Sequence, residues 1–366
     1  MLVRVKHIIG VLIVLLMFTS CDKIRFHVNY VSGPSLMLNV TCDINNSGPD
    51  YFVAVECDAN QGTSYIVRTQ SVGPEEQTED DRYTLRCIID LYRVINSQSE
   101  FVERRINMVN MRDLSIPAAQ FNVNAEEYRV LVWCDYVRSS EVEESLCYKT
   151  DDLKNILYND IEIKDNNMKD AFTAMANVNL RDYKSILTGV YDISEHLTLE
   201  RPNGFMKCVT TDIKEFAANN DTDEITCMMS YVQYVAAGYS VEEQKPNNFE
   251  IERTFTSTVS TKDFSANGEL VLCYDCIFVN GKQTNVKINM AFYNGHMTLV
   301  DNQLVKDDGT IVPFEDCITS WSNISVPLKK NMETIVSGRL LTTSFDPGGI
   351  GINPGFEDEI IIPWND

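Results

Sequence analysis

The feature that most constrains this chain is a recurring short run in which apolar residues alternate with polar ones between turn residues. In the run NVKINMAFY, the polar residues Asn285, Lys287 and Asn289 alternate with apolar residues. Because successive side chains of a strand point to opposite faces, this period of two predicts strands with one buried face. The strand–helix alternation of parallel nucleotide-binding sheets is not found in the sequence. An all-β fold built mainly from antiparallel sheets is therefore predicted.

The run YRVLVWCDYV, residues 128–137, differs because it has almost no polar break. On a strand, one face carries Val130, Val132, Cys134 and Tyr136, and the other carries Leu131, Trp133, Asp135 and Val137. Two apolar faces are typical of a central strand in a two-sheet sandwich. Cys134 lies among valines, whereas a reactive thiolate needs basic neighbours and some exposure. We interpret this run as core rather than as an active-site strand.

Helical patterns are few and short. They cover residues 151–159, where Asp151 or Asp152 is the expected N-cap, residues 165–175 and, less clearly, residues 211–220. Such segments are expected to decorate loops of the β fold.

The first 21 residues have the pattern of a signal peptide. Arg4 and Lys6 precede eleven mostly apolar residues, Ile8 to Phe18, which are too few to span about 30 Å of hydrocarbon. The stretch FTSC that follows resembles a bacterial lipobox, so we expect Cys21 to carry lipid and to become the mature N-terminus. The alternative is a soluble exported protein that keeps a cysteine at its cleavage site.

The mature chain of 345 residues is longer than one core usually serves, so two domains are expected. The predicted division is a signal peptide at 1–21, β-sandwich domains at 22–182 and 183–345, and a glycine-rich hinge with a C-terminal strand at 346–366. A loose similarity between residues 131–137 and 270–275 suggests two related modules, although coincidence explains it equally well. Removal of the signal peptide lowers the net charge from −22 to −24, which excludes nucleic acid as a partner.

Ten cysteines remain after Cys21, and most lie inside apolar runs, where a thiol acts as a small hydrophobe. We therefore expect few or no disulfides. The motif CYDC, residues 273–276, matches a redox or zinc pattern. On a strand, however, Cys273 and Cys276 point to opposite faces about 10 Å apart, too far for a disulfide or shared metal ligation. Both are expected to be structural thiols.

Catalytic and metal-binding patterns are weak throughout the sequence. His27, His196 and His296 have no metal-ligand spacing, and no nucleophile elbow, phosphate-binding loop or zinc-protease motif occurs. The acidic residues of NNDTDEIT, residues 219–226, lack the spacing of a calcium loop. We expect no catalytic residue, no cofactor and no metal site.

Seven stretches, in this order along the chain, carry a resemblance to a known family. They are LRCIIDLYRV (85–94), VERRI (102–106), EYRVLVWCDYV (127–137), CYKTDDLKNI (147–156), KDAFTAMANVNL (169–180), HLTLERPNGFMKCVTTDI (196–213) and SVPLKKNMETIVSGRLLT (325–342). Their order and spacing resemble fimbrillin-like lipoproteins of the Bacteroidota over most of residues 30–345. The chain departs from that pattern by placing cysteine at positions 87, 134 and 208, where the family has apolar residues or tyrosine.

The resemblance implies two tandem transthyretin-like Greek-key β-sandwich domains, exported as a lipoprotein to the outer membrane or cell surface. It also implies a structural or adhesive role without enzymatic activity. The expected partners are other fimbrial subunits or further copies of the chain, joined by strand addition, together with the membrane through the lipid and a host or bacterial surface ligand. Many family members have no assigned role, so the alternative is a monomeric surface lipoprotein that binds a glycan or a protein.

The C-terminal tail is the candidate donor strand for such an assembly. A glycine-rich stretch, residues 346–355, precedes an isolated apolar run of Ile360, Ile361 and Ile362 with charged flanks. The competing interpretation is that this run pairs with the sheet of its own C-terminal domain or trails loosely.

We predict that Cys21→Ser abolishes labelling of the protein with palmitate, because the acyl chain has no other expected attachment point. Processing of the unchanged precursor is expected to be sensitive to globomycin. Palmitate labelling that persists in the variant would contradict the lipid anchor.

Overall fold

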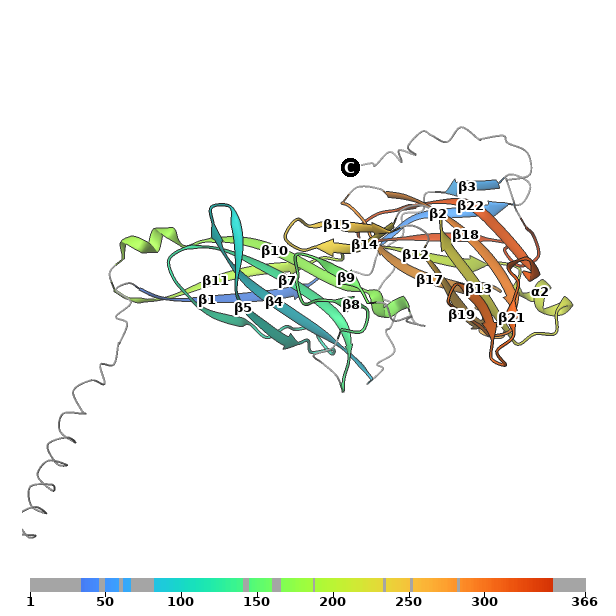
Figure 1. Ribbon diagram of the computed structural model, residues 1–366, viewed down its shortest axis with the longest axis horizontal. Coiled ribbons are helices and arrows are strands. Elements are labelled where there is room, and N and C mark those ends of the chain that lie inside the picture. The colour runs from blue at the N-terminus through green and yellow to red at the C-terminus, as the bar shows by residue number, and fades with distance from the viewer. Residues whose placement is uncertain are drawn as a thin grey trace, which may run out of the picture.

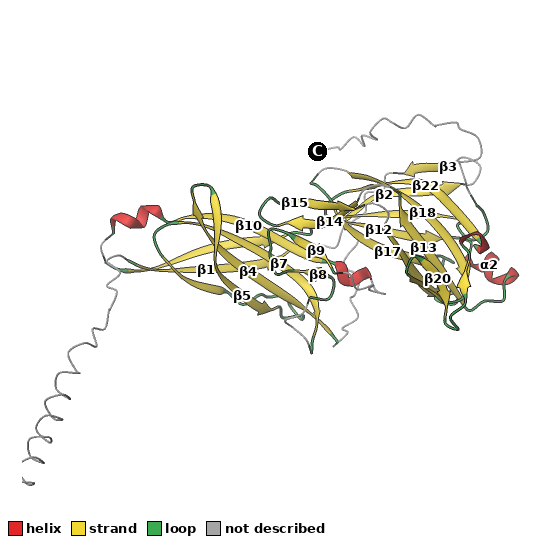
Figure 2. Cartoon of the chain, viewed as in Figure 1, coloured by secondary structure: helices red, strands yellow, loops and turns green. Residues whose placement is uncertain are grey.

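The computed structural model describes residues 34–45, 50–58, 62–66, 82–140, 145–159, 166–186, 188–232, 235–250, 253–281 and 284–344. Strands make up most of this part of the chain, and helices are short (Figure 2). Two β-sandwiches follow one another along the longest axis of the molecule (Figure 1). The all-β class predicted from the alternating runs is confirmed.

The first sandwich packs a three-stranded sheet, in the order β11-β1-β6, against a four-stranded sheet, in the order β10-β7-β4-β5. Nearly all neighbouring strands are antiparallel, but β1 and β11 run parallel. The strands are β1 (Ser35–Ile44), β4 (Tyr83–Ile95), β5 (Gln98–Met108), β6 (Ala119–Val123), β7 (Glu127–Arg138), β10 (Ala171–Asn179) and β11 (Val190–Leu199).

The core of the first sandwich follows from the alternation on β7. Val130, Val132 and Cys134 are fully buried between the two sheets. Leu131 and Trp133 point to the opposite face and are fully buried there in a different cluster. The prediction that both faces of residues 128–137 are covered is confirmed, and Cys134 has the packing role expected of it.

The second sandwich packs a nine-stranded sheet against a four-stranded sheet in the order β16-β13-β18-β22. The larger sheet has the order β3-β2-β23-β12-β17-β14-β9-β8, with β15 paired to β14. Its strands are β2 (Asp50–Asp58), β3 (Gly62–Ile66), β8 (Tyr148–Lys149), β9 (Ile156–Tyr158), β12 (Asn203–Thr210), β14 (Val235–Ser240), β15 (Lys245–Glu250), β17 (Leu270–Phe278) and β23 (Met332–Gly338). The smaller sheet contains β13 (Glu224–Tyr231), β16 (Thr254–Ser260), β18 (Thr284–Asn294) and β22 (Thr319–Leu328).

A small three-stranded sheet, β19 (Met297–Val300), β20 (Gln303–Lys306) and β21 (Ile311–Val312), extends the second sandwich. The described helices are the α-helix α2 (Ile213–Asn219) and the 3-10 helices η1 (Asn166–Lys169), η2 (Arg181–Ser185) and η3 (Phe314–Asp316). Helix α2 confirms the pattern at residues 211–220. The helix expected at residues 151–159 is wrong, because that segment forms turns and then β9. In the described residues, no helix has the length and apolar character needed to cross a membrane.

Each sandwich takes strands from both sides of residue 182. Strand β2, drawn in blue beside the red and orange strands in Figure 1, pairs with β23 in the second sandwich. Strand β11 pairs with β1 in the first sandwich. The predicted domain boundary between residues 182 and 183 is a statement about which segments fold independently. It stays a prediction.

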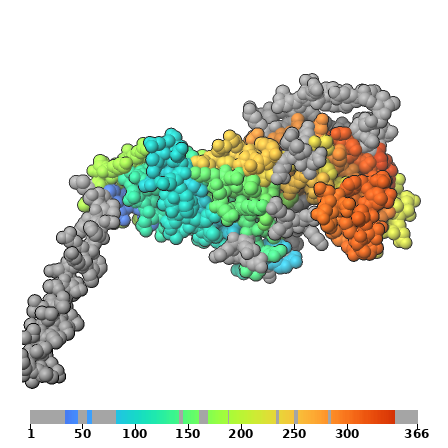
Figure 3. All heavy atoms as spheres, in the orientation of Figure 1, coloured from blue at the N-terminus to red at the C-terminus, as the bar shows by residue number. Residues whose placement is uncertain are grey.

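An aromatic cluster fills the junction between the sandwiches. Trp133 on β7 lies 5.2 Å from Tyr148 and 6.2 Å from Phe278 of β17, measured between ring centroids. Tyr158 stacks on Phe278 at 4.8 Å, and Tyr239 of β14 lies 5.4 Å from the same ring. The β14–β15 region and the segment that carries β8 and β9 lie between the two sandwiches (Figure 1) and form the yellow and green surface where they meet (Figure 3). Because large rings bury much apolar area, this cluster joins both sandwiches into one packed unit.

A buried ion pair crosses the same junction. Lys169, at the end of η1 just before β10, donates from Nζ to Asp275 Oδ1 on β17 at 2.7 Å. The hydroxyl of Tyr231 donates to the other carboxylate oxygen at 2.8 Å. Burial disfavours the charged carboxylate, but Lys169 and Arg253 outweigh this and hold the pKa of Asp275 below its usual range. The carboxylate is therefore charged at neutral pH and ties the two sandwiches together.

We predict that Asp275→Asn lowers the free energy of unfolding by about 3–5 kcal/mol, because it leaves a buried ammonium without its counter-charge. The matched control is Asp223→Asn, which removes an exposed ion pair with Lys262 and should cost under about 1 kcal/mol. Urea unfolding at pH 7 measures both.

The contribution of Asp275 to the free energy of unfolding depends on pH with a defined sign. A carboxyl whose pKa is lowered by folding stabilises the folded state above its unfolded pKa, about 4, and loses that contribution as the pH falls through the folded value. The difference between the wild type and Asp275→Asn should therefore shrink in acid. Equal costs for the two variants at pH 7 would contradict a junction that depends on this pair.

Candidate functional site

The site residues predicted from the sequence lie outside the described residues. Cys21, the expected lipid attachment point, precedes residue 34, and Ile360, Ile361 and Ile362 follow residue 344. Their roles stay predictions. Among the described residues, the position of β1 within its sheet bears on the predicted strand addition.

That position is the seat of β1, the groove between β11 and β6. Strand β1 is the middle strand of its sheet, parallel to β11 from Ser35↔Val190 to Ile44↔Leu199 and antiparallel to β6 from Leu36↔Val123 to Val40↔Ala119. It therefore has hydrogen-bonding neighbours on both edges. Its removal would leave two unpaired strand edges facing one another.

The side chains of β1 alternate in agreement with this position. Leu36, Leu38, Val40 and Cys42 are at most 3% exposed and lie in the core of the first sandwich. The residues between them are half-buried or exposed on the opposite side. At about 1.5–3 kcal/mol for each large apolar side chain, these residues anchor β1 firmly. A replacement strand must supply apolar side chains at the same period of two.

The connection of strand β1 along the chain is a second feature of its position. Strand β1 is the first strand of the described chain, and after it the chain crosses to β2 in the second sandwich. Strand β1 is thus followed along the chain by a strand of the other sandwich rather than by a strand of its own sheet. The family resemblance implied that the first strand region, residues 25–40, could be displaced. The sequence did not place β1 between β11 and β6, because the parallel pairing with β11 joins segments about 150 residues apart.

The cysteines form two similar clusters of buried free thiols. Cys87 and Cys134 are direct cross-strand partners on β4 and β7, and Cys42 reaches them from the opposite sheet. In the second sandwich, Cys208 and Cys273 are cross-strand partners on β12 and β17, and Cys227 reaches them from the opposite sheet. The ten cysteines in the described residues are free thiols.

The clustered thiols of the first sandwich, Cys42, Cys87 and Cys134, are poor nucleophiles. A hydrogen bond that Cys42 donates to Cys87, together with burial, raises the pKa of Cys42, and burial raises the pKa of Cys134. Since only a thiolate attacks, a buried thiol with a raised pKa is inert in the folded protein. Cys273 packs in the core of the second sandwich, whereas Cys276 is buried outside that cluster. The structure thus agrees with opposite orientations for the two ends of the CYDC motif.

The other acidic candidates have structural partners. Asp152 accepts a hydrogen bond from the backbone N–H of Lys154 at 2.9 Å and so caps a turn rather than a helix. Asp223 pairs with Lys262 at 2.6 Å. Asp135, next to Trp133, is fully buried and accepts hydrogen bonds from Arg86 on the neighbouring strand. Within the described ranges, no three His, Cys, Asp or Glu residues are placed to hold a metal ion.

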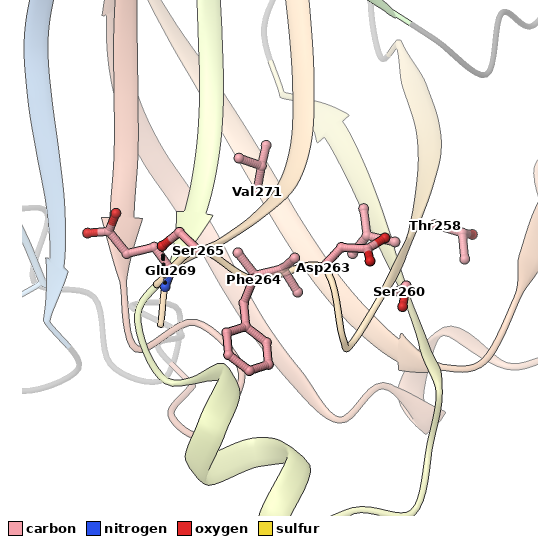
Figure 4. A pocket seen from close by; sticks show the side chains of 9 residues that line it. Thr258, Ser260, Asp263, Phe264, Ser265, Glu269 and Val271 are labelled. Atoms are coloured by element: carbon pink, nitrogen blue, oxygen red, sulfur yellow. Dashed lines mark hydrogen bonds between the residues drawn. The ribbon is translucent and has the colours of Figure 1, made fainter. Parts of the chain in front are cut away.

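A hollow of about 490 Å³ lies where β16 approaches the start of β17 (Figure 4). The apolar part of its lining includes Val259, Leu270 and Val271, and the Phe264 ring points towards α2 in Figure 4. The polar part is Thr258 and Ser260, which are partly buried, and Asp263, Ser265 and Glu269, which are exposed. The backbone N–H of Glu269 donates to Ser265 Oγ at 3.2 Å. The lining offers hydroxyl and carboxylate groups to a polar ligand, but its water-exposed side chains do not form a rigid site.

Comparison with known proteins gives distant structural matches. A candidate cell adhesion protein from Bacteroides eggerthii matches with 11% identity and a TM-score of 0.40, covering 85% of this chain and 89% of that one. A candidate polysaccharide-binding protein from Bacteroides thetaiotaomicron matches with 8% identity and a TM-score of 0.39, covering 79% and 80%. The tip fimbrial protein of Porphyromonas gingivalis, truncated at its C-terminus, matches with 6% identity and a TM-score of 0.28, covering 80% of each chain.

By their descriptions, two of these matched structures are adhesion or fimbrial proteins and one is a polysaccharide-binding protein. With TM-scores of 0.40 or less, these likenesses assign no activity, ligand or partner to this chain. No curated protein matches the sequence. A family described as a family of unknown function, DUF6562, matches residues 50–365, and the chain therefore belongs to that family.

Proposed function

We propose that this protein is a non-enzymatic lipoprotein of the cell envelope, a structural or adhesive subunit of the fimbrillin-like type. In this proposal, Cys21 carries the lipid that holds the chain at the outer membrane or cell surface. Subunits then assemble by strand addition, in which a strand of one copy, or of another fimbrial subunit, completes a sheet of the next.

The observation that carries this proposal is the seat of β1. A middle strand with buried apolar side chains on one face, placed at the beginning of the fold, can be replaced by a strand of the same pattern. Replacement restores every lost backbone hydrogen bond, so the exchange is favourable only for a strand that also fills the apolar positions.

The C-terminal tail has a sequence that suits this seat. Ile360, Ile362 and Trp364 alternate along the chain, so a tail in extended form presents all three on one face. The glycine-rich stretch 346–355 spans up to about 33–36 Å when extended, enough to carry the tail away from its own sheet. Pro363 lacks a backbone N–H and would weaken one ladder position. The tail would enter the seat left by β1 in a neighbouring subunit.

The alternative function is a monomeric surface lipoprotein that binds a glycan or a protein. The observation in its favour is the hollow between β16 and β17, whose rim of hydroxyl and carboxylate groups suits a hydroxyl-rich ligand. Binding by a stable monomer would favour this alternative over strand addition.

We predict that the mature protein forms SDS-resistant ladders and rods, in which the tail of one copy displaces β1 of the next. Deletion of residues 346–366 should abolish them. The double variant Ile360→Asp/Ile362→Asp should also abolish them, because a carboxylate buried in the seat has no partner. Gels and electron microscopy measure the assembly.

The matched control is Ile361→Asp, which places the same charge on the opposite face of the tail and should keep the ladders. Ladders that form equally well without residues 346–366 would overturn the role of the tail. A protein that stays monomeric in all conditions while retaining glycan binding would support the alternative.

A further inference from the structure

Strand β5 is an open edge of the first sandwich. It pairs with β4 along one side, and in the described part of the chain no strand pairs with its other side. The two-residue turn of Asn96 and Ser97, both at positive φ, joins β4 and β5 into a long hairpin. An open edge of this length is a template for another strand unless its side chains prevent pairing.

The β4–β5 hairpin also collects exposed apolar side chains. Phe101, Val102 and Ile106 on β5 are 55%, 44% and 45% exposed, and Ile95 at the end of β4 is 43% exposed. Large side chains left in water on one short strand mark an interaction surface more often than the same residues scattered singly. The occupant of this edge must therefore offer apolar groups as well as backbone hydrogen bonds.

The charges on β5 indicate which occupant fits. Glu103 and Arg105 lie on one face of the strand and form an ion pair with each other at 2.6 Å, while the Arg105 guanidinium is 5.9 Å from the ring centroid of Phe121 on β6. The opposite face carries Arg104 and Ile106, paired across the ladder with Asp90 and Ile88. When two copies of the strand pair antiparallel about the residue between Glu103 and Arg105, the acidic residue of each copy lies opposite the basic residue of the other.

We propose that β5 of one copy pairs with β5 of a second copy across a two-fold axis centred on Arg104. This arrangement places Glu103 opposite Arg105 of the second copy, and it brings Val102, at the β-bulge of β5, near Ile106 of the second copy. Each of these pairs occurs twice because the interface is isologous. The two four-stranded sheets become one continuous sheet through the dimer.

The register follows from the faces of the strand. A two-fold axis perpendicular to the sheet leaves each face of the strand on the same side of the sheet. Two residues that lie opposite one another must therefore point to the same face, so the axis must pass between the two copies of a single residue. Centring on Glu103 or on Arg105 opposes that charge to itself and separates Val102 from Ile106. Centring on Arg104 opposes two guanidinium groups, but each already donates to Asp90 at 2.7 and 2.8 Å. The favoured register is therefore the one with complementary charges and matched apolar residues.

This dimer is distinct from assembly by strand addition, and it does not rest on that proposal. Strand addition is head-to-tail and uses β1 and the tail, whereas β5 pairing is symmetric and closes after two copies. The dimer dissociates in SDS, so its failure and the failure of strand addition are separately visible.

Charge exchange tests the proposal on the full mature chain, with Cys21→Ser to keep it in solution. Analytical ultracentrifugation from about 1 to about 500 µM is expected to show a reversible dimer. Glu103→Arg alone and Arg105→Glu alone each create two like-charge pairs and should raise the Kd about tenfold or more. Mixing the two single variants should restore association as a heterodimer, because each charge then meets its opposite. The double variant Glu103→Arg/Arg105→Glu should dimerise like the wild type.

Two further variants separate the interface from general surface effects. Ile106→Lys should weaken the dimer, whereas Ile311→Lys, at an exposed site on β21, should not. Circular dichroism confirms that each variant is folded. A wild type that stays monomeric at the highest concentration would overturn the proposal. So would single charge variants that dimerise normally, or a mixture of them that fails to associate.

Discussion

The ion pair between Lys169 and Asp275 is the interaction on which the arrangement of the two sandwiches depends. A charge buried without a partner costs several kcal/mol, so both residues are tolerated only when the first sandwich brings Lys169 to the strand that carries Asp275. The aromatic cluster around Trp133 supplies apolar burial at the same junction, but apolar contacts alone accept many orientations. The ion pair with Tyr231 selects one of them.

The period-two pattern predicted the strands because it is local. On β7, the assignment of Val132 to one face and Trp133 to the other follows from alternation alone, and the structure places them in different clusters. Strand pairing is not local, and it was not predictable in the same way. The crossing of β2 to β23 and the parallel pairing of β1 with β11 depend on how completed sheets meet. For the same reason, residues 151–159 were misassigned: their helical spacing was overridden when Ile156 and Leu157 met β14.

The candidate site was predictable only in part. The alternation of Leu36, Leu38 and Val40 is visible in the sequence, but a buried strand that can be exchanged has the same composition as any other buried strand. The loose similarity between residues 131–137 and 270–275 gains meaning from the structure. Cys134 and Cys273 each sit opposite another cysteine within their sheet, and each meets a third thiol from the facing sheet. Two sandwiches that repeat such a detail are more alike than their sequences indicate.

Strands β1 and β5 represent two different ways in which a sandwich can join a neighbour. Strand β1 is fully paired and anchored by buried side chains, so its exchange has a high barrier, and any product that forms is long-lived. Strand β5 has one free side and half-exposed apolar residues, so its pairing needs no unfolding and is reversible. The charges of β5 limit that reversible pairing to a matching partner, because Glu103 and Arg105 repel a strand whose charges are not in the opposite order. If both proposals hold, a slow, durable connection and a fast, selective one lie on opposite sheets of the same sandwich.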